Sequence, residues 1–230
     1  MKQAVVTGGT RGIGRAVADR LATEGWEVLV LARQPAAGPH RFAACDVADA
    51  DAVRRVFARL SQVDALVNCA GIAGTNRLED SDDGLWHAII ATNLHGTYHT
   101  CKSALRLLPD DAGRIVNIAS VLGLRGVPDQ TAYCAAKHGV VGFTRALALV
   151  LARRGITVNA LCPGWVETDM AAQRYAALGI TAEQAASGVP TGRVATPAEI
   201  ADAVMWLLRA EARGITGHAL PIDGGGLALP

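Results

Sequence analysis

The sequence predicts an α/β fold in which one doubly wound, parallel sheet of seven strands carries helices on both faces. Short continuous apolar runs alternate with longer segments of helical period, which is the pattern of parallel strands buried by crossover helices. The 230 residues contain no Ser/Gly linker, low-complexity tract or internal repeat. We therefore expect a single domain over residues 1–230.

Seven apolar runs are the expected strands, and they cover residues 4–7, 27–32, 41–45, 65–68, 114–118, 157–161 and 219–222. Helices are expected over residues 13–23, 49–60, 85–107, 132–153 and 197–208. The last of these has a capping sequence, because Thr196 precedes Pro197 and Glu199 occupies the third helical position. The connection from Arg33 to Asp46 is too short for a helix of about three turns with its loops, so that sheet edge should be bare.

The segment 168–193 lies between the sixth strand and the last helix, where doubly wound sheets place ligand-covering loops. We expect it to form a substrate lid containing one or two short helices. Apolar side chains there either face a hydrophobic substrate or pack the lid itself. They are Met170, Tyr175, Leu178 and Ile180, with Trp165 just before the segment.

Composition and charge exclude several classes of partner. The chain has 22 Lys and Arg against 21 Asp and Glu and no basic run, so neither nucleic acid nor an anionic membrane is indicated. No run of about 18 apolar residues predicts a membrane span. The first residues enter a strand pattern without the features of a signal peptide, so we expect a cytoplasmic protein.

The five cysteines are isolated from one another and show no CxxC or Cys/His spacing. They predict neither a disulfide framework nor a metal site. We interpret them as reduced, small hydrophobic residues. They are Cys45, Cys69, Cys101, Cys134 and Cys162.

A glycine-rich turn joins the first strand to the first helix and reads TGGTRGIG at residues 7–14. Glycines at this place let the backbone turn tightly and approach a pyrophosphate at the helix N-terminus. Taken alone, the motif also fits an ordinary tight turn. Small residues after the fourth strand, Asn68-Cys69-Ala70-Gly71, can lie against an adenosine ribose or form a simple turn.

The end of the second strand predicts NADP(H) rather than NAD(H). A carboxylate normally accepts the ribose 2′-hydroxyl of NAD here, whereas this chain has Arg33. Arg33 and Arg11 can pair with a 2′-phosphate, the alternative being that both are solvated loop residues. Asp46 after the third strand either accepts from the adenine amino group or caps the helix expected over residues 49–60.

Tyr133 and Lys137 are the candidate reactive pair, because residues at i and i+4 share one face of a helix. A phenol titrates near pH 10 in water, and a neighbouring cation favours the phenolate, so Lys137 should lower the pKa of Tyr133. Ser120 ends the fifth strand at the edge where such sheets bind ligands. Asn93 inside a long helix indicates a side-chain contact to backbone or water. Each residue alone also fits a capping or solvent-exposed role.

In this order the motifs resemble the short-chain dehydrogenase/reductase family over essentially the whole chain. They are TGGTRGIG, NCAG, Ser120, YCAAK, PGWVET at residues 163–168 and Asp223-Gly224-Gly225. The resemblance implies a Rossmann-type fold, a catalytic tetrad, and a homotetramer, or less often a dimer, built partly on the two long helices. The tetrad would be Asn93, Ser120, Tyr133 and Lys137.

The resemblance also implies which residues hold the cofactor. Gly8, Gly12, Ile13 and Gly14 would meet the pyrophosphate, and Thr168 with the Val166 backbone would hold the carboxamide. The complete predicted set is Gly8, Thr10, Arg11, Gly12, Ile13, Gly14, Arg33, Asp46, Val47, Asn68, Ala70, Gly71, Tyr133, Lys137, Pro163, Gly164, Val166 and Thr168.

Within the family, residues 136–144 and 155–159 resemble 3-oxoacyl-acyl carrier protein reductases and aromatic polyketide ketoreductases. This predicts NADP(H)-dependent reduction of a 3-oxoacyl thioester carried on acyl carrier protein or coenzyme A. The segment 109–113 is acidic where the carrier-protein reductases are basic, although Arg153 and Arg154 keep part of a basic surface. Carrier-protein docking is therefore in question.

Two other functions remain open from the sequence. One is an oxidoreductase for a free small or cyclic ketone or secondary alcohol. The other is a protein that binds NADP as a sensor without catalysis, which would have no need for the Tyr133 and Lys137 pair.

Overall fold

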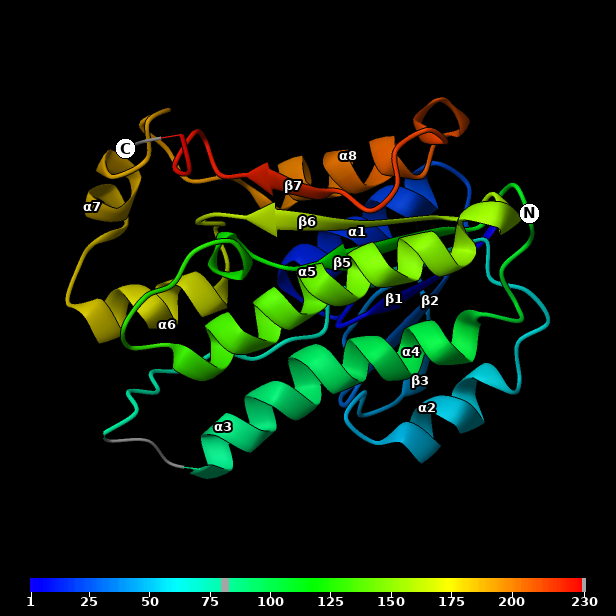
Figure 1. The fold of residues 1–230 in the computed structure, drawn as a ribbon, viewed down its shortest axis with the longest axis horizontal. Helices are drawn as coiled ribbons and strands as arrows, with labels where there is room; N and C mark the ends of the chain where they lie inside the picture. Colours follow the sequence, from blue (N-terminus) through cyan, green and yellow to red (C-terminus); the bar gives the residue numbers. More distant parts are fainter. Residues whose placement is uncertain (80–82, 229–230) are drawn as a thin grey trace.

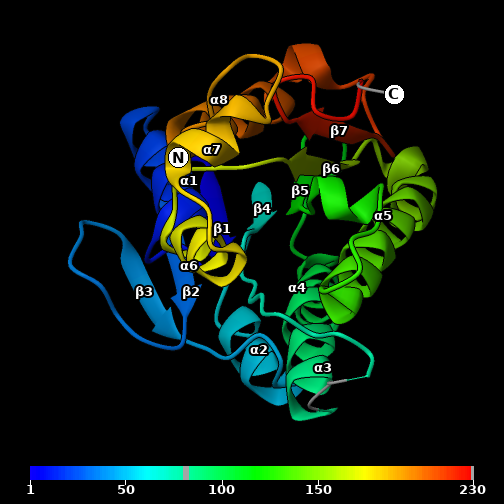
Figure 2. The same cartoon turned by 90° about the vertical axis from the view of Figure 1, so that its left-hand side faces the viewer.

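Seven parallel strands form one sheet in the order β3-β2-β1-β4-β5-β6-β7, in a computed structural model that describes residues 1–79 and 83–228 (Figures 1 and 2). The predicted parallel sheet is confirmed. The strands are β1 (Gln3–Thr7), β2 (Glu27–Ala32), β3 (Arg41–Ala44), β4 (Ala65–Asn68), β5 (Arg114–Ile118), β6 (Thr157–Pro163) and β7 (Ala219–Ile222). The largest differences from expectation are that β6 runs two residues further, to Pro163, and that β3 ends at Ala44.

Alternate residues of each central strand enter separate cores on the two faces of the sheet. Val6 on β1 packs with α1 (Gly12–Thr23) and α8 (Pro197–Leu207). Val5 packs on the opposite side with α2 (Ala50–Phe57), α4 (Gly96–Ala104) and α5 (Thr131–Leu151). Figure 2 shows the sheet between these two layers. Full burial of one Val, Leu or Ile side chain stabilises the fold by about 1.5–3 kcal/mol, so covering both faces explains the continuous apolar runs.

The helix expected over residues 85–107 is not one regular α-helix. It is α3 (Asp83–Ile89), a π-helical turn η1 (Ile90–His95) and then α4. The Asn93 side chain pairs outside its own helix, since Ile72 N donates to Oδ1 at 2.8 Å and Nδ2 donates to Ile72 O at 2.9 Å. The expected contact from Asn93 to backbone is confirmed, and the π turn is of the kind often found at functional sites.

The β3 edge is bare, as the short connection after Arg33 predicts. No helix joins β2 to β3, β3 is largely exposed, and Phe42 is an exposed apolar side chain. The loop is instead tied to α1, where Arg15 Nη1 donates to Ala37 O at 2.7 Å and His40 Nε2 lies 2.7 Å from Asp19 Oδ1.

The segment 168–193, the predicted lid, contains two short helices, α6 (Asp169–Leu178) and α7 (Ala182–Ser187), which lie beyond the carboxyl ends of the strands (Figure 1). Thr168 caps α6 by accepting from Ala171 N, and Thr181 with Gln184 forms a capping box on α7. These caps fix where each lid helix begins.

Residues Thr131–Arg154, which comprise α5 and the turn that follows it, are long and apolar enough to cross a membrane by length and composition. The expectation that no segment reaches this threshold was therefore wrong. Val140, Leu147 and Leu151 of this helix are buried in the cores beneath the sheet. Packing against the sheet accounts for the apolar composition of α5.

Candidate active site

Two adjoining cavities open at the carboxyl ends of the strands, one of about 790 Å³ and one of about 600 Å³. The smaller one lies at the glycine turn and the larger one between α5 and the lid. They share Ile13, Gly71, Thr168 and Met170 as walls. A ligand that extends from one cavity into the other therefore passes between α1 and the lid.

The glycine turn has the shape that a dinucleotide pyrophosphate needs. A Cβ on Gly14 would lie 2.3 Å from Gly8 O, and Gly8 itself has φ +65°, so neither position accepts a side chain. The first turn of α1 has no acidic residue, and Arg11 makes no side-chain capping bond. The backbone N–H groups of this first turn of α1 are thus available to an anion at the positive end of the helix.

The smaller cavity gathers most of the predicted cofactor residues. Arg11 and Arg33 line it, and neither side chain has an ion pair within the described ranges 1–79 and 83–228. The predicted residues that line it are Gly8, Thr10, Arg11, Gly12, Ile13, Gly14, Arg33, Asp46, Val47, Ala70, Gly71 and Thr168. Tyr133, Lys137, Pro163, Gly164 and Val166 line the larger cavity.

Asp46 does not cap α2, which excludes one of its two predicted roles. Asp49 caps that helix by accepting from Asp51 N and Ala52 N, whereas Asp46 Oδ1 accepts from Ala48 N at 2.9 Å. Contact with an adenine amino group stays a prediction for Asp46.

Asn68 lines neither cavity, unlike the other predicted cofactor residues. Its Nδ2 donates to Asn117 Oδ1 at 2.9 Å, and its Oδ1 accepts from Thr100 Oγ1 at 2.7 Å. Asn117 Nδ2 in turn donates to Thr144 Oγ1 at 2.9 Å. These four buried side chains, here called the Asn68–Asn117 network, join β4 and β5 to α4 and α5.

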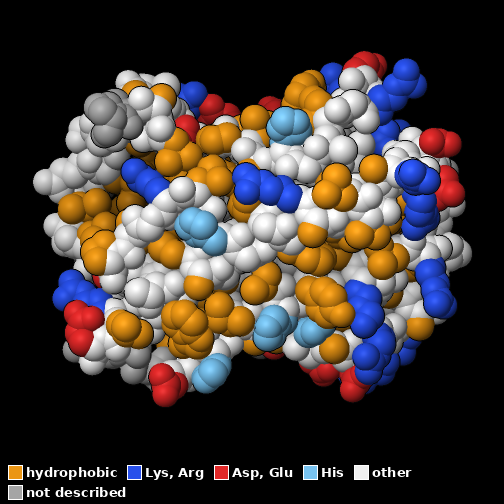
Figure 3. Space-filling model, viewed as in Figure 1, with side chains coloured by type: hydrophobic (Ala, Val, Ile, Leu, Met, Phe, Trp, Pro, Cys, Tyr) orange, Lys and Arg blue, Asp and Glu red, His pale blue; other side chains and the backbone are white. Residues whose placement is uncertain are grey.

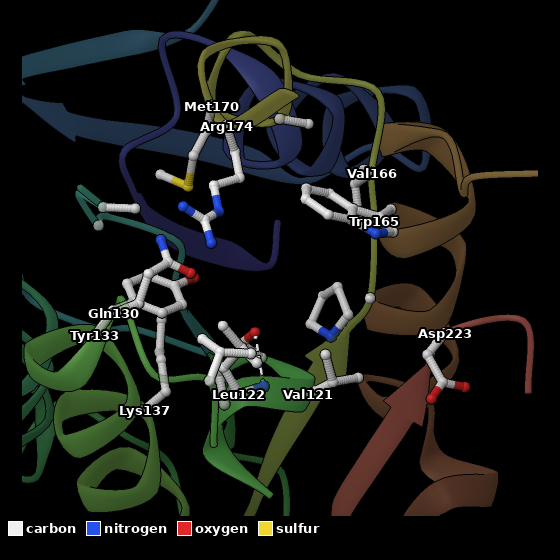
Figure 4. A pocket seen from close by; sticks show the side chains of 18 of the residues that line it. Val121, Leu122, Gln130, Tyr133, Lys137, Trp165, Val166, Met170, Arg174 and Asp223 are labelled. Atoms are coloured by element: carbon white, nitrogen blue, oxygen red, sulfur yellow. Dashed lines mark hydrogen bonds between the residues drawn. The ribbon is translucent and has the colours of Figure 1, made fainter. Parts of the chain in front are cut away.

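Three of the four predicted tetrad residues, Ser120, Tyr133 and Lys137, line the larger cavity, whereas Asn93 lines neither cavity and lies beside Gly71. Lys137 Nζ donates to Ile118 O at 2.7 Å and lies 5.5 Å from the centre of the Tyr133 ring (Figure 4). Gly71 separates Lys137 from Asn93, because a Cβ there would be 3.8 Å from Lys137 Nζ and 3.3 Å from Asn93 Oδ1. The fold thus brings together residues from η1, β5 and α5.

Ser120 follows β5 with its hydroxyl at the cavity wall. Its Oγ accepts from Leu122 N at 3.1 Å and caps the short 3₁₀ turn Val121–Gly123. Because this bond uses a lone pair, the hydroxyl hydrogen remains available for donation, and a hydrogen bond from Ser120 lowers the pKa of Tyr133.

Burial governs the titration of the reactive pair. It raises the pKa of Tyr133 to about 12, despite the Ser120 hydrogen bond, and lowers the pKa of Lys137 to about 8. The net shift is the reverse of the lowering expected beside Lys137, because desolvation of the phenolate is the largest effect. Tyr133 is consequently protonated at neutral pH, as a proton donor must be.

A residue that the sequence does not single out sets the start of α5. Asn76 Oδ1 accepts from Thr131 Oγ1 at 2.7 Å and from Ala132 N at 3.1 Å, and Asn76 O accepts from Thr131 Oγ1 at 2.9 Å. These bonds cap the helix from another part of the chain and fix the turn that carries Tyr133.

Further polar residues line the larger cavity without having been predicted. Arg174 on α6 is paired through Nη2 with both carboxylate oxygens of Asp129, each at 2.8 Å. Residues of these types are common on protein surfaces, so the sequence does not single them out. Only Asp129 and Gln130 could have been noticed, because they lie close to Tyr133 in the sequence. The set is Arg77, Arg125, Asp129, Gln130 and Arg174.

The lid side chains divide between the two predicted roles. Trp165, Met170 and Leu178 line the larger cavity. Tyr175 packs on Trp165 with ring centres 4.9 Å apart, and neither it nor Ile180 lines the cavity. The cavity thus has one apolar wall made by the lid.

Comparison with known proteins gives matches along nearly the whole chain. Residues 8–226 match the family described as Enoyl-(Acyl carrier protein) reductase. The chain is 41% identical to a putative ketoacyl reductase of Streptomyces coelicolor, covering 96% of this chain and 95% of the relative. It is 40% identical to a 3-oxoacyl-[acyl-carrier-protein] reductase of Vibrio harveyi, with coverage of 97% and 96%.

Among solved structures, the chain is similar to a single-site variant of actinorhodin polyketide ketoreductase with NADPH. The TM-score is 0.90 and the sequence identity 39%, and the match covers 98% of this chain and 97% of the other.

Proposed function

Since the chain belongs to the short-chain dehydrogenase/reductase family of oxidoreductases, we propose that it is an NADP(H)-dependent ketoreductase whose substrate is a 3-oxoacyl thioester. The observation that carries this proposal is that Ser120, Tyr133 and Lys137 line a cavity adjoining the one at the glycine turn. The relatives named as ketoacyl and 3-oxoacyl reductases support the substrate class.

The residues around the cavity can carry out the proton chemistry of carbonyl reduction. A bound NADPH supplies the hydride that the carbonyl carbon receives. Tyr133 donates its phenolic proton to the carbonyl oxygen, and Ser120 donates a hydrogen bond to the same oxygen as negative charge develops there. Lys137 stabilises the phenolate that remains, and a water held near Asn93 would return a proton from solvent.

Arg11 and Arg33 support NADP(H) as the cofactor, because both line the smaller cavity and no acid stands at the end of β2. Replacing Arg33 with Ala is expected to weaken NADPH binding roughly tenfold or more and to leave NADH binding nearly unchanged. A hydrogen bond to a charged group typically contributes about 1.5–3 kcal/mol, and only NADPH has the 2′-phosphate. The measurement is fluorescence titration of each reduced cofactor.

Arg59→Ala is the matched control for this variant, because Arg59 lies after α2 and lines neither cavity. Equal losses of NADPH and NADH affinity in Arg33→Ala would contradict the assignment.

The surface that a carrier protein would need is partly neutralised. Arg154 Nε donates to Asp110 Oδ1 at 2.7 Å, and its other nitrogens donate to Leu105 O and Leu108 O. This favours a coenzyme A thioester over a carrier-protein thioester. The apolar lid wall, with Trp165 and Leu178, also favours a second candidate, a free hydrophobic or cyclic ketone.

A substrate panel tests the proposed function. Oxidation of NADPH and, in parallel, NADH is followed by absorbance with acetoacetyl-coenzyme A, an acetoacetyl carrier protein, a cyclic ketone and a simple aliphatic ketone. We expect the highest kcat/KM with NADPH and acetoacetyl-coenzyme A. Tight NADPH binding without turnover of any substrate would instead indicate a sensor.

The surface over α4 and α5 supports assembly into a homo-oligomer, a tetramer or a dimer. Tyr98 on α4 and Leu149 and Val150 on α5 are exposed, and Figure 3 shows apolar side chains gathered over this face. Large exposed apolar patches commonly mark contacts between chains. We also propose a cytoplasmic location, which the five free cysteines support.

A further inference from the structure

The amide of Gln130 is a polar group that the mechanism above does not use. Gln130 immediately precedes α5, is 6% exposed and lines the larger cavity. Its backbone oxygen accepts from Cys134 N, but its side chain makes no capping bond and has no hydrogen-bond partner in the part of the chain that the structure describes. The amide is absent from the buried, unsatisfied side-chain atoms of the described residues, so it is open to the cavity, where a ligand that reaches it can take up its free hydrogen-bonding positions.

The polar side chains nearby bond other parts of the chain, and Asn76 Nδ2, which is buried without a partner, does not bond Gln130 either. Both carboxylate oxygens of Asp129 accept from Arg174 Nη2. Asn76 Oδ1 accepts hydrogen bonds from Thr131 Oγ1 and Ala132 N in the first turn of α5. Gln130 therefore faces the cavity with its donor and acceptor unused.

Gln130 lies close to the reacting group. It precedes Tyr133 by three residues, which is about one helical turn or ~5 Å along the axis. Figure 4 shows its amide beside the Tyr133 ring, on the side from which Arg174 points into the cavity. Ser120 and Tyr133 serve the oxygen that is reduced, so Gln130 meets a different polar atom of the same substrate.

We propose that Gln130 donates a hydrogen bond to a second carbonyl oxygen of the substrate and thereby selects 1,3-dicarbonyl compounds over simple ketones. In a 3-oxoacyl thioester this oxygen belongs to the thioester, two carbons from the carbonyl that is reduced. The inference rests on the proposed ketoreductase function and adds a specificity-determining residue to it. A site built around a buried hydrogen-bonding group discriminates against analogues that lack the matching atom.

The test compares Gln130→Met with the wild type on ethyl acetoacetate and on 2-hexanone, a ketone of similar length without the ester. Loss of one neutral hydrogen bond is expected to lower kcat/KM for ethyl acetoacetate about tenfold and to change that for 2-hexanone less than about twofold. Because the Gln130 side chain caps nothing, its removal takes no hydrogen bond from the fold. An equal loss of kcat/KM for both ketones, or no loss of kcat/KM for ethyl acetoacetate, would overturn the proposal.

Two further variants control for indirect effects. Gln62→Met makes the same chemical change at an exposed residue outside both cavities and should leave both ketones unaffected. Gln130→Asn keeps the amide on a shorter side chain, so its kcat/KM for ethyl acetoacetate should fall less than that of Gln130→Met. A larger loss for the Asn variant would contradict a hydrogen-bonding role.

A binding measurement separates this inference from the proposed function. Calorimetry with ethyl acetoacetate and NADP⁺, which cannot donate hydride, should give about tenfold weaker binding to Gln130→Met than to the wild type. If the wild type reduces neither ketone, the proposed function fails, but the affinity ratio still decides the role of Gln130. An unchanged affinity would overturn that role.

Discussion

Replacing Tyr133 with Phe is expected to lower kcat at least about a hundredfold, the usual scale of general acid catalysis, while NADPH affinity stays unchanged. The substitution removes the proton donor and keeps the ring. With its pKa raised to about 12, the phenol is protonated throughout the neutral range, so the wild type should not lose its proton donor there. Single-turnover reduction of acetoacetyl-coenzyme A, with NADPH binding followed by fluorescence, measures both quantities.

Tyr98→Phe is the matched control, because it removes the same hydroxyl from an exposed tyrosine on α4. That hydroxyl accepts from Lys102 Nζ on the surface, so turnover should be unaffected. Near-normal turnover in Tyr133→Phe would refute the assignment of Tyr133 as the acid.

Replacing Lys137 with Met is expected to abolish most turnover. It is also expected to raise the free energy of unfolding, most of all below about pH 8. The buried ammonium, 5% exposed, has its pKa lowered from 10.5 to about 8. Between these values the unfolded chain binds more protons than the folded one, so wild-type stability rises with pH there and is lowest below about pH 8. Methionine carries no charge and escapes this pH-dependent cost.

The gain in free energy of unfolding from Lys137→Met over the wild type should be larger at about pH 6 than at about pH 9.5, by on the order of 2 kcal/mol. Urea unfolding of both proteins at the two pH values measures this difference. Lys102→Met, which removes an exposed lysine on α4, should show no such dependence. A gain that does not change with pH would show that Lys137 is not destabilised by burial.

The strands and the reactive pair were predictable because each leaves a local pattern. Burial on both faces of the sheet produces the continuous apolar runs, and the spacing of Tyr133 and Lys137 follows from one helical turn. Glycine positions in the first turn are similarly local, since the close approach of Gly14 to Gly8 O involves residues six apart.

Features that depend on distant parts of the chain were not predictable in the same way. The π turn at Asn93 is accompanied by contacts to Ile72, and the Asn68 side chain turns toward Asn117 rather than a cavity. The raised pKa of Tyr133 depends on how deeply the assembled site buries the phenol. Gln130 gains its significance only because its amide, unpaired among the described residues, faces the larger cavity beside Tyr133.

The Asn68–Asn117 network has a consequence for how the chain finds its native pairing. Asn68 and Asn117 are direct register partners on β4 and β5, and their amides are satisfied by each other and by threonines on α4 and α5. A slip of one residue between the strands would turn one amide to the opposite face and leave both without partners in an apolar core. The network therefore penalises misregistered folding intermediates, and the strand ends that carry Ser120 and Gly71 become aligned only when all four elements have docked.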